Sequence, residues 1–383
     1  MKARVKMGRN GDNMLTKIEE AIEVLKQGRM IILVDDEHRE NEGDLCMLAE
    51  HCTAADINFM AHYGCGLICL TMTSDRLKEL NIEPQVAHNT SRFHTAFHVS
   101  IEAARGVTTG ISAADRATTI RTAVSPTCRA EDLARPGHMF PISARPGGVL
   151  VRVGQTEGSV DFAKLCGSTV PAGVICEIMK EDGTMARMPD LEVFSQIHQM
   201  PIVTIADLIA YRLRSESLVR CIKTDVLQKG IAAGFTAHIF RSEIDGSRYL
   251  ALSYGWDKDC GKTPLVRVHS GALWVDALAL DDSGNSIVSV LERIRQNGCG
   301  VVLYIPREST SLEEAIDANV KPEVDEEAVN RVPPELRFYG IGAQCLRALG
   351  ITDMTLLTDS PKKMSALDGF GLHVVQTLSM TRP

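Results

Sequence analysis

Residues 30–49 read MIILVDDEHRENEGDLCMLA, and this stretch decides how the N-terminal half folds. Five apolar residues, 30–34, are typical of a buried strand, and LCMLA returns to apolar sequence at 45–49. Between them, residues 35–44 carry six carboxylates and one arginine, Arg39. Gly43 permits a sharp turn. We therefore expect an acidic loop that core strands hold at both ends.

The crowding of carboxylates in this loop has a chemical consequence. Carboxylates this close repel one another, which raises some of their pKa values and makes a bound cation stabilising. A hard-metal site with carboxylates left over for proton transfer fits this pattern. A solvated acidic turn also fits it, because runs of charge usually lie on the surface. Charge alone leaves both interpretations open.

Helix and strand signals alternate through the first half of the chain. Thr16 and Glu19 form a capping-box pattern ahead of an apolar stripe, and Thr53 can cap a second helix. Strand signals lie at 66–72, 147–153 and 172–179, and a helix is expected at 204–214. This alternation predicts a layered α/β domain.

The composition changes near residues 215–219, where a new set of strand signals begins. We expect a flexible lead at 1–14, an α/β domain at 15–218 and an α+β domain at 219–383, so that the whole chain is α+β. Further helices are expected at 286–296 and 341–349. The acidic segment 308–327 has no strong apolar period and is expected to be a mobile surface loop.

Composition excludes several classes of function. The net charge of -8 argues against a nucleic-acid partner, and the absence of an apolar run of 18 residues argues against a membrane span. The eleven cysteines are odd in number and form no CxxC pair. They are expected to be reduced core thiols of a cytoplasmic protein, which also weakens any structural zinc site.

Three other stretches carry groups that could bind a substrate. GVTTGISAADR at 106–116 offers hydroxyls, including that of Thr109, and flexible amides, as a phosphate-binding loop would. RPGHMF at 135–140 is expected to place His138 in a Pro-Gly turn. GGVLVRVGQTE at 147–157 is expected to run from a strand into a polar loop with Arg152 and Thr156. A simple turn, or a buried and satisfied histidine, would explain any one of them alone.

Together, these stretches resemble the 3,4-dihydroxy-2-butanone 4-phosphate synthase family. NTS at 89–91, ARPGGVL at 144–150 and PAGVICEIMKEDGTMAR at 171–187 complete the match, in the family's order and spacing, over about residues 18–212. The resemblance implies a lyase of riboflavin biosynthesis that converts D-ribulose 5-phosphate to 3,4-dihydroxy-2-butanone 4-phosphate and formate. It also implies Mg²⁺ or Mn²⁺ as cofactor and a homodimer with active sites at its interface.

The resemblance also implies roles for individual residues. It places the metal on Glu40, with Gln155 at the position of the second ligand. Substrate contacts are implied for Arg39, Asp44, Arg152, Thr156, Thr109 and Glu177. Catalytic or pocket-lining roles are implied for His138, Glu177, Glu42, Asp44 and Cys69.

Two positions depart from the family pattern. The family has histidine at the second ligand, where this chain has Gln155, and glycine in NTSxxGT, where this chain has His94. An amide oxygen can bind Mg²⁺ but suits softer metals less than imidazole does. A divergent paralogue making a related four-carbon unit and a non-catalytic regulator of riboflavin enzymes are therefore the alternatives to the synthase.

The second half resembles GTP cyclohydrolase II through LVRVHS at 265–270, YGIGAQCLRALGI at 339–351 and LLTDSPKKMSALDGFGLHV at 356–374. After VHS the family has three zinc-binding cysteines, whereas residues 271–285 (GALWVDALALDDSGN) contain no cysteine and no histidine. The family's stretch rich in arginine and glycine is replaced by PRESTSLEEAIDA at 306–318. Because a catalytic zinc needs about three protein ligands, we expect no zinc, no GTP hydrolysis, and a scaffolding or regulatory domain.

Overall fold

The structure is a computed structural model that describes residues 16–35, 39–256, 263–271, 287–306, 334–358 and 371–380. Two compact units, Met1–Ile209 and Ala210–Pro383, make up the chain, and each is treated by itself. The predicted domain limits at 14/15 and 218/219 stay predictions. The expected flexible lead at 1–14, the acidic segment 308–327, and residues 272–285 and 307–318 of the second half lie outside the described residues.

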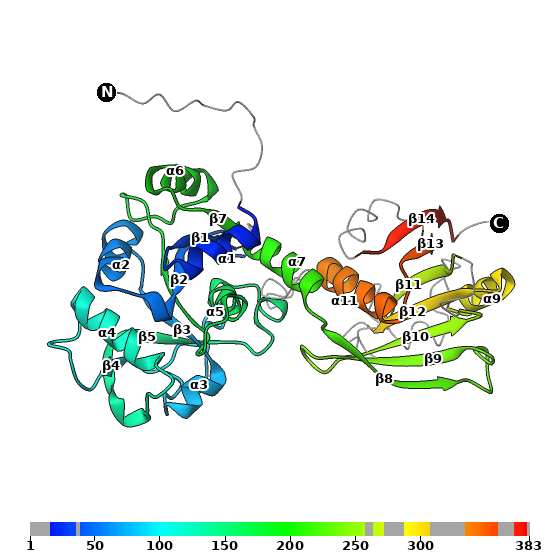
Figure 1. Ribbon diagram of the computed structural model, residues 1–383, viewed down its shortest axis with the longest axis horizontal. Helices are drawn as coiled ribbons and strands as arrows, with labels where there is room; N and C mark the ends of the chain where they lie inside the picture. Colours follow the sequence, from blue (N-terminus) through cyan, green and yellow to red (C-terminus); the bar gives the residue numbers. More distant parts are fainter. Residues whose placement is uncertain are drawn as a thin grey trace, which may run out of the picture. The chain divides into compact units, whose positions relative to one another are not determined.

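The first unit is built on one mixed sheet of strand order β4-β5-β3-β6-β2-β1-β7 (Figure 1). Its strands are β1 (Ile31–Val34), β2 (Gly43–Leu48), β3 (Cys69–Thr73), β4 (Ile101–Ala103), β5 (Leu133–Ala144), β6 (Ala172–Glu177) and β7 (Ile202–Thr204). The strands β1 and β2 pair antiparallel, with Val34 opposite Gly43. The acidic loop therefore joins two neighbouring core strands, as the sequence predicts.

Helices cover this sheet on two faces. They are α1 (Ile18–Lys26), α2 (Ala54–Phe59), α3 (Ser74–Glu79), α4 (Ala113–Ala123), α5 (Gln155–Cys166), α6 (Met188–His198) and α7 (Ile205–Ser215), the last of which crosses the division between the units. On one face Leu45, Leu70 and Val174 form a core with buried residues of α2, α3, α4 and α6. Because strand residues alternate between faces, Asp44, Thr71 and Glu177 point to the opposite face.

A buried hydroxyl pair joins this second face to α5. The Thr71 and Ser159 hydroxyls are 2.7 Å apart, and Thr71 Oγ1 also exchanges hydrogen bonds with the backbone of Gly173. Ser159 in turn donates to the carbonyl of Thr156, in the first turn of α5. The start of α5, with Gln155 and Thr156, is thus fixed over the central strands.

Strand register gathers four predicted site residues at one end of the sheet. Asp44 on β2 is directly opposite Glu177 on β6. Cys69 on β3 pairs with Phe140 on β5 and with Ile175 on β6. His138, two residues before Phe140, and Glu177, two residues after Ile175, therefore lie toward the same end, because β5 and β6 run in opposite directions.

The second unit carries a separate seven-stranded sheet of order β14-β13-β11-β12-β10-β9-β8. Its strands are β8 (Val219–Val226), β9 (Thr236–Ser242), β10 (Arg248–Tyr254), β11 (Leu265–Gly271), β12 (Gly300–Pro306), β13 (Asp353–Leu357) and β14 (His373–Leu378), and its helices are α9 (Ile287–Asn297) and α11 (Pro334–Ala348). Phe235, Leu252 and Val302 form a core with buried residues of α9. The predicted fold class, α+β for the whole chain with an α/β first domain and an α+β second domain, is confirmed.

Three local predictions are wrong. The expected strand at 147–153 is a 3₁₀ turn, Gly148–Leu150, because Gly147 and Gly148 adopt φ values of 93° and 65° that a strand cannot include. RPGHMF lies within strand β5, so His138 is not in a turn. Helix α1 has Lys17 at its N-cap and no capping side chain, since the backbone amide of Thr16 donates to Ile202. Among the described residues, no helix is long and apolar enough to cross a membrane.

Replacing the buried Thr71 by valine should lower the free energy of unfolding of the full chain by about 1–2 kcal/mol, because buried partners lose their hydrogen bonds. The double variant Thr71→Val/Ser159→Ala should cost less than the sum of the two single changes. Thr127→Val, in the exposed Ser125–Thr127 pair, is the matched control, with an expected change below about 0.5 kcal/mol. Urea unfolding measures these values, and strict additivity would contradict the coupling.

Candidate active site

The acidic loop is organised around the buried carboxylate of Asp35, which follows β1. One of its oxygens accepts from the backbone amide of Glu40 at 3.1 Å, and the other from that of Glu42 at 2.8 Å. The side chain of Asp35 is 0% exposed. Asp35 therefore shapes the loop from inside and is not a solvated charge. A sequence cannot separate this carboxylate from its neighbours, because the distinction depends on which side chain turns inward.

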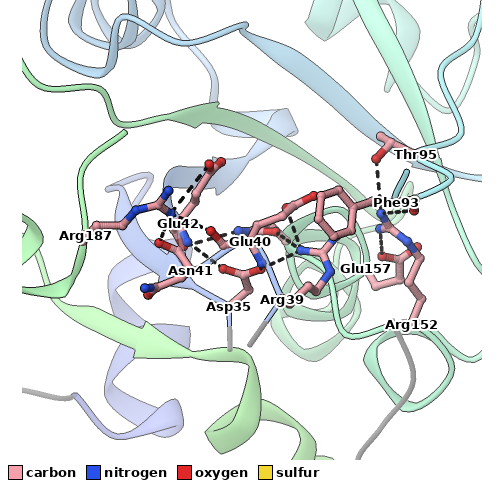
Figure 2. Close-up of polar contacts among 11 residues, drawn as sticks. Asp35, Arg39, Glu40, Asn41, Glu42, Phe93, Thr95, Arg152, Glu157 and Arg187 are labelled. Atoms are coloured by element: carbon pink, nitrogen blue, oxygen red, sulfur yellow. Dashed lines mark hydrogen bonds and ion pairs between the residues drawn. The ribbon is translucent and has the colours of Figure 1, made fainter. Parts of the chain in front are cut away.

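Arg39 occupies the centre of the site. Its Nη1 donates to Asp35 Oδ2 at 2.7 Å, to Glu40 Oε2 at 2.7 Å and to Gln155 Oε1 at 3.0 Å. Figure 2 shows this guanidinium between the loop carboxylates and the ring of Phe93, whose centroid lies 5.4 Å from Arg39 Cζ. Three oxygens thus converge on one cationic nitrogen, in a place where the arginine side chain is 2% exposed.

Gln155 reaches the loop from the first position of α5. Its Oε1 accepts from Arg39, while its Nε2 donates to the carbonyl of Glu42 at 3.4 Å. The amide is therefore oriented by both of its ends, with the oxygen toward Arg39 and Glu40. Arg152 lies outside the helices and strands, as predicted, but Thr156 follows Gln155 within helix α5 and is not in a loop.

A second arginine lies beyond Phe93. Arg152 Nη1 pairs with Glu157 Oε2 at 2.7 Å, and its Nη2 donates to the carbonyl of Phe93 and to Thr95 Oγ1 (Figure 2). Its Nε is buried and has no hydrogen-bond partner among the described residues. Glu157 also accepts from the amide of Arg145, which fixes the pair.

The NTSRFHT segment positions the ring that separates these arginines. His94 adopts φ 50°, and its amide donates to Ser91, which closes a turn after Phe93. Glycine adopts this left-handed conformation most readily. This explains why the family that the chain resembles has glycine at the position of His94.

On the other side of Arg39, Arg187 binds the outer end of the loop. Its Nη1 donates to the carbonyls of Glu40 and Asn41 and lies 3.7 Å from Glu42 Oε1. Figure 2 places Arg187, Arg39 and Arg152 in a row along the site. Arg187, Glu157 and Phe93 are not among the residues predicted from the sequence. The one available signal was the position of Arg187 at the end of the matched stretch 171–187.

Three further carboxyls have pKa values raised above their usual range. Burial is the main cause for Asp44, whose pKa is raised strongly, and the charge of neighbouring Glu177 adds to it. Burial also raises the pKa of Glu177, even though Leu67 donates its amide to Glu177 Oε2 at 2.8 Å. Burial and the charge of Glu40 raise that of Glu42. These groups hold protons more readily than exposed carboxyls, which suits acid–base roles.

Cys69 lies close to this group on β3, where burial raises the pKa of its thiol. The thiol is therefore neutral at physiological pH and does not supply a thiolate nucleophile. Its position suits the lining role that the resemblance implies.

His138 pairs with a different carboxylate, and Thr109 belongs to a loop with contacts of its own. His138 Nδ1 lies 2.7 Å from Glu102 Oε2 across strands β5 and β4. The GVTTGISAADR loop binds its own aspartate: Asp115 accepts from the amide and hydroxyl of Thr108 and from the amide of Gly110, which lowers the pKa of Asp115 to about 2. The donors predicted to hold a phosphate are thus used by Asp115, and Thr109 is left exposed.

The fit of a metal to Glu40 and Gln155 can be judged from this geometry. Within the described part of the chain, no group of three His, Cys, Asp or Glu side chains could hold a metal ion. Glu40 Oε2 and Gln155 Oε1 nevertheless converge on one positively charged atom. They fit a cation, and the cation in this structure is Arg39.

Comparison with known proteins gives two family matches. The family described as 3,4-dihydroxy-2-butanone 4-phosphate synthase matches residues 19–211, and GTP cyclohydrolase II matches residues 221–379. A riboflavin biosynthesis protein RibBA of Aquifex aeolicus is 48% identical over 374 residues, which are 94% of this chain and 91% of that protein.

Two solved structures are also similar. RibBX, a two domain 3,4-dihydroxy-2-butanone 4-phosphate synthase from A. baumannii, is 38% identical, with a TM-score of 0.78 over 95% of this chain and 99% of its own. A 3,4-dihydroxy-2-butanone 4-phosphate synthase in complex with two magnesium ions is 35% identical, with a TM-score of 0.50 over 52% of this chain and 98% of its own.

Glu157→Ala should destabilise the full chain by about 3 kcal/mol in urea unfolding, because it leaves the buried guanidinium of Arg152 without its carboxylate. The matched control is Glu131→Ala, in the surface pair with Arg129 whose side chains are 78% and 74% exposed. That change should cost less than about 0.5 kcal/mol. Equal effects of the two substitutions would refute the buried role of Glu157.

Proposed function

Since the chain belongs to the 3,4-dihydroxy-2-butanone 4-phosphate synthase family, enzymes of riboflavin biosynthesis, we propose that its acidic loop is the site that converts D-ribulose 5-phosphate to 3,4-dihydroxy-2-butanone 4-phosphate and formate. The observation that carries the proposal is that Glu40 Oε2 and Gln155 Oε1 meet at Arg39 Nη1, while the other end of the Gln155 amide donates to the backbone carbonyl of Glu42. Carboxyls with raised pKa values and a row of arginines adjoin that point.

The arginines suit the anionic substrate. Arg152 has a buried Nε without a partner in the described chain, and Thr156 is in the first turn of α5, one residue before the Glu157 that pairs with Arg152. A helix N-terminus favours anions, and a guanidinium pairs well with phosphate. We assign these two residues to the phosphate of the substrate. Thr109, exposed beside the Asp115-bound turn, is kept as a more distant substrate contact.

The carboxyls suit the proton transfers. Forming an enediol from a ketose requires a base that removes a carbon-bound proton, and the rearrangement and loss of formate require further transfers. Glu42, Asp44 and Glu177 have pKa values shifted upward from different environments, so one can be ionised while another is protonated. We assign them these roles, and we assign His138, held by Glu102, to a further transfer. Cys69 lines the site.

Glu40 and Gln155 would hold a divalent ion, Mg²⁺ or Mn²⁺. When bound, such an ion stabilises negative charge on substrate oxygens. Two oxygen donors suit a hard cation, which keeps water or substrate oxygens in its other positions. The synthase of known structure that binds two magnesium ions supports this assignment. We also propose a cytoplasmic homodimer that acts on this small sugar phosphate, as the resemblance implies.

The chain also carries a GTP cyclohydrolase II domain. We propose that this domain does not hydrolyse GTP and binds no zinc, because residues 271–285 contain neither cysteine nor histidine. The matched A. baumannii protein of two domains is described as a 3,4-dihydroxy-2-butanone 4-phosphate synthase. We propose that the domain instead acts as a scaffold for the synthase or regulates it.

Purified full chain should release formate from D-ribulose 5-phosphate with Mg²⁺ or Mn²⁺, and Glu40→Ala should reduce the rate by about 100-fold or more, since it removes a carboxylate that binds the cation. Glu20→Ala, at an exposed position of α1, should leave the rate unchanged. Absence of formate with either metal, or full activity of Glu40→Ala, would sink the proposal. A four-carbon product other than the expected one would instead indicate a divergent paralogue.

The same chain should release no formate from GTP, with or without added Zn²⁺. A bifunctional RibBA enzyme assayed in parallel supplies the positive control for the reaction. Zinc-dependent formate release from GTP would show that ligands elsewhere in residues 219–383 complete a metal site.

A further inference from the structure

The two residues proposed to hold the metal already share a cation. Arg39 Nη1 lies 2.7 Å from Glu40 Oε2 and 3.0 Å from Gln155 Oε1. A divalent ion would sit about 2.1 Å from the same oxygens. A guanidinium nitrogen and a metal ion bound to the same two oxygens would lie close together, and their positive charges would repel.

From this geometry we infer that Arg39 is an internal counter-cation for Glu40 and Gln155, and that a divalent metal binds these two residues by displacing its guanidinium. The inference rests on the proposed function, because it takes Glu40 and Gln155 as the metal ligands. It adds that a metal ion bound to Glu40 and Gln155 excludes the contacts of Arg39 with these two residues.

The surroundings of Arg39 allow this exchange without leaving a buried charge unpaired. Asp35 also accepts from Arg39 Nη1, at 2.7 Å, and its carboxylate is held in place by two backbone amides. The face of Phe93 offers the guanidinium further support at 5.4 Å. Arg39 can therefore give up two of its acceptors and keep its ion pair with Asp35.

The two vacated oxygens would stay in position for a metal. Gln155 Nε2 donates to the carbonyl of Glu42, which holds Oε1 toward the centre of the site. The side chain of Glu40 is 22% exposed, whereas that of Arg39 is 2% exposed. The side chain of Glu40 is therefore the more accessible of the two to an ion from solvent.

The test is equilibrium binding of Mn²⁺ to the full chain, followed by the electron paramagnetic resonance signal of free Mn²⁺. Arg39→Met removes the competing charge but keeps an extended apolar side chain, so it should lower the dissociation constant by about tenfold or more. Arg92→Met is the matched control. Arg92 is exposed and lies over the same ring, with Cζ 5.3 Å from the Phe93 centroid, and its loss should change the constant by less than about threefold.

A second comparison covers the case in which Arg39→Met leaves Asp35 unpaired and does not fold. Asp35→Asn/Arg39→Met removes both charges of the buried pair, and it should bind Mn²⁺ more tightly than Asp35→Asn alone. The inference is overturned if the loss of Arg39 leaves Mn²⁺ binding unchanged or makes it weaker in either comparison. It is also overturned if neither of the two proteins compared binds Mn²⁺.

Glu40→Ala separates this inference from the proposed function. If Glu40→Ala abolishes Mn²⁺ binding while Arg39→Met leaves it unchanged, Glu40 remains the ligand and only the competition is wrong. If Glu40→Ala binds Mn²⁺ as the unsubstituted chain does, the metal assignment and the inference both fall.

Discussion

The guanidinium of Arg39, shared by Asp35, Glu40 and Gln155, is the interaction on which the acidic loop depends. Carboxylates packed between two core strands would repel one another, and a buried charge needs a partner of opposite sign. Arg39 supplies that partner from within the loop. It also ties the loop to α5 through Gln155, so the loop and the helix N-terminus are held together.

The sheet determines what surrounds this centre. Residues that alternate along β2 and β6 send Leu45 and Val174 into the apolar core and turn Asp44 and Glu177 toward α5. Those two carboxyls are consequently buried beside each other, and burial and mutual repulsion raise the pKa of Asp44. One side of the sheet therefore provides stability while the other provides ionisable groups, which is how a small α/β domain can carry acid–base chemistry near neutral pH.

Much of the fold could be predicted from the sequence, because periodicity and caps are local. MIILV formed a strand, Thr53 capped α2 with Asp56, and Thr204 accepted the amide of Asp207 at the start of α7. The site was predictable only as a set of motifs. The inward turn of Asp35, the Arg152–Glu157 pair and the use of the 106–116 loop by Asp115 depend on contacts between distant residues or on side-chain direction. The strand prediction at 147–153 failed for a similar reason, because the left-handed conformations of Gly147 and Gly148 depend on their surroundings in the folded chain.

The most direct test is a crystal structure of the full chain with Mn²⁺, in which anomalous scattering locates the ion. The account predicts Mn²⁺ within about 2.3 Å of oxygens of both Glu40 and Gln155, with the Arg39 guanidinium moved away from those two residues and still paired with Asp35. Mn²⁺ bound elsewhere, with Arg39 Nη1 still between Glu40 and Gln155, would contradict it.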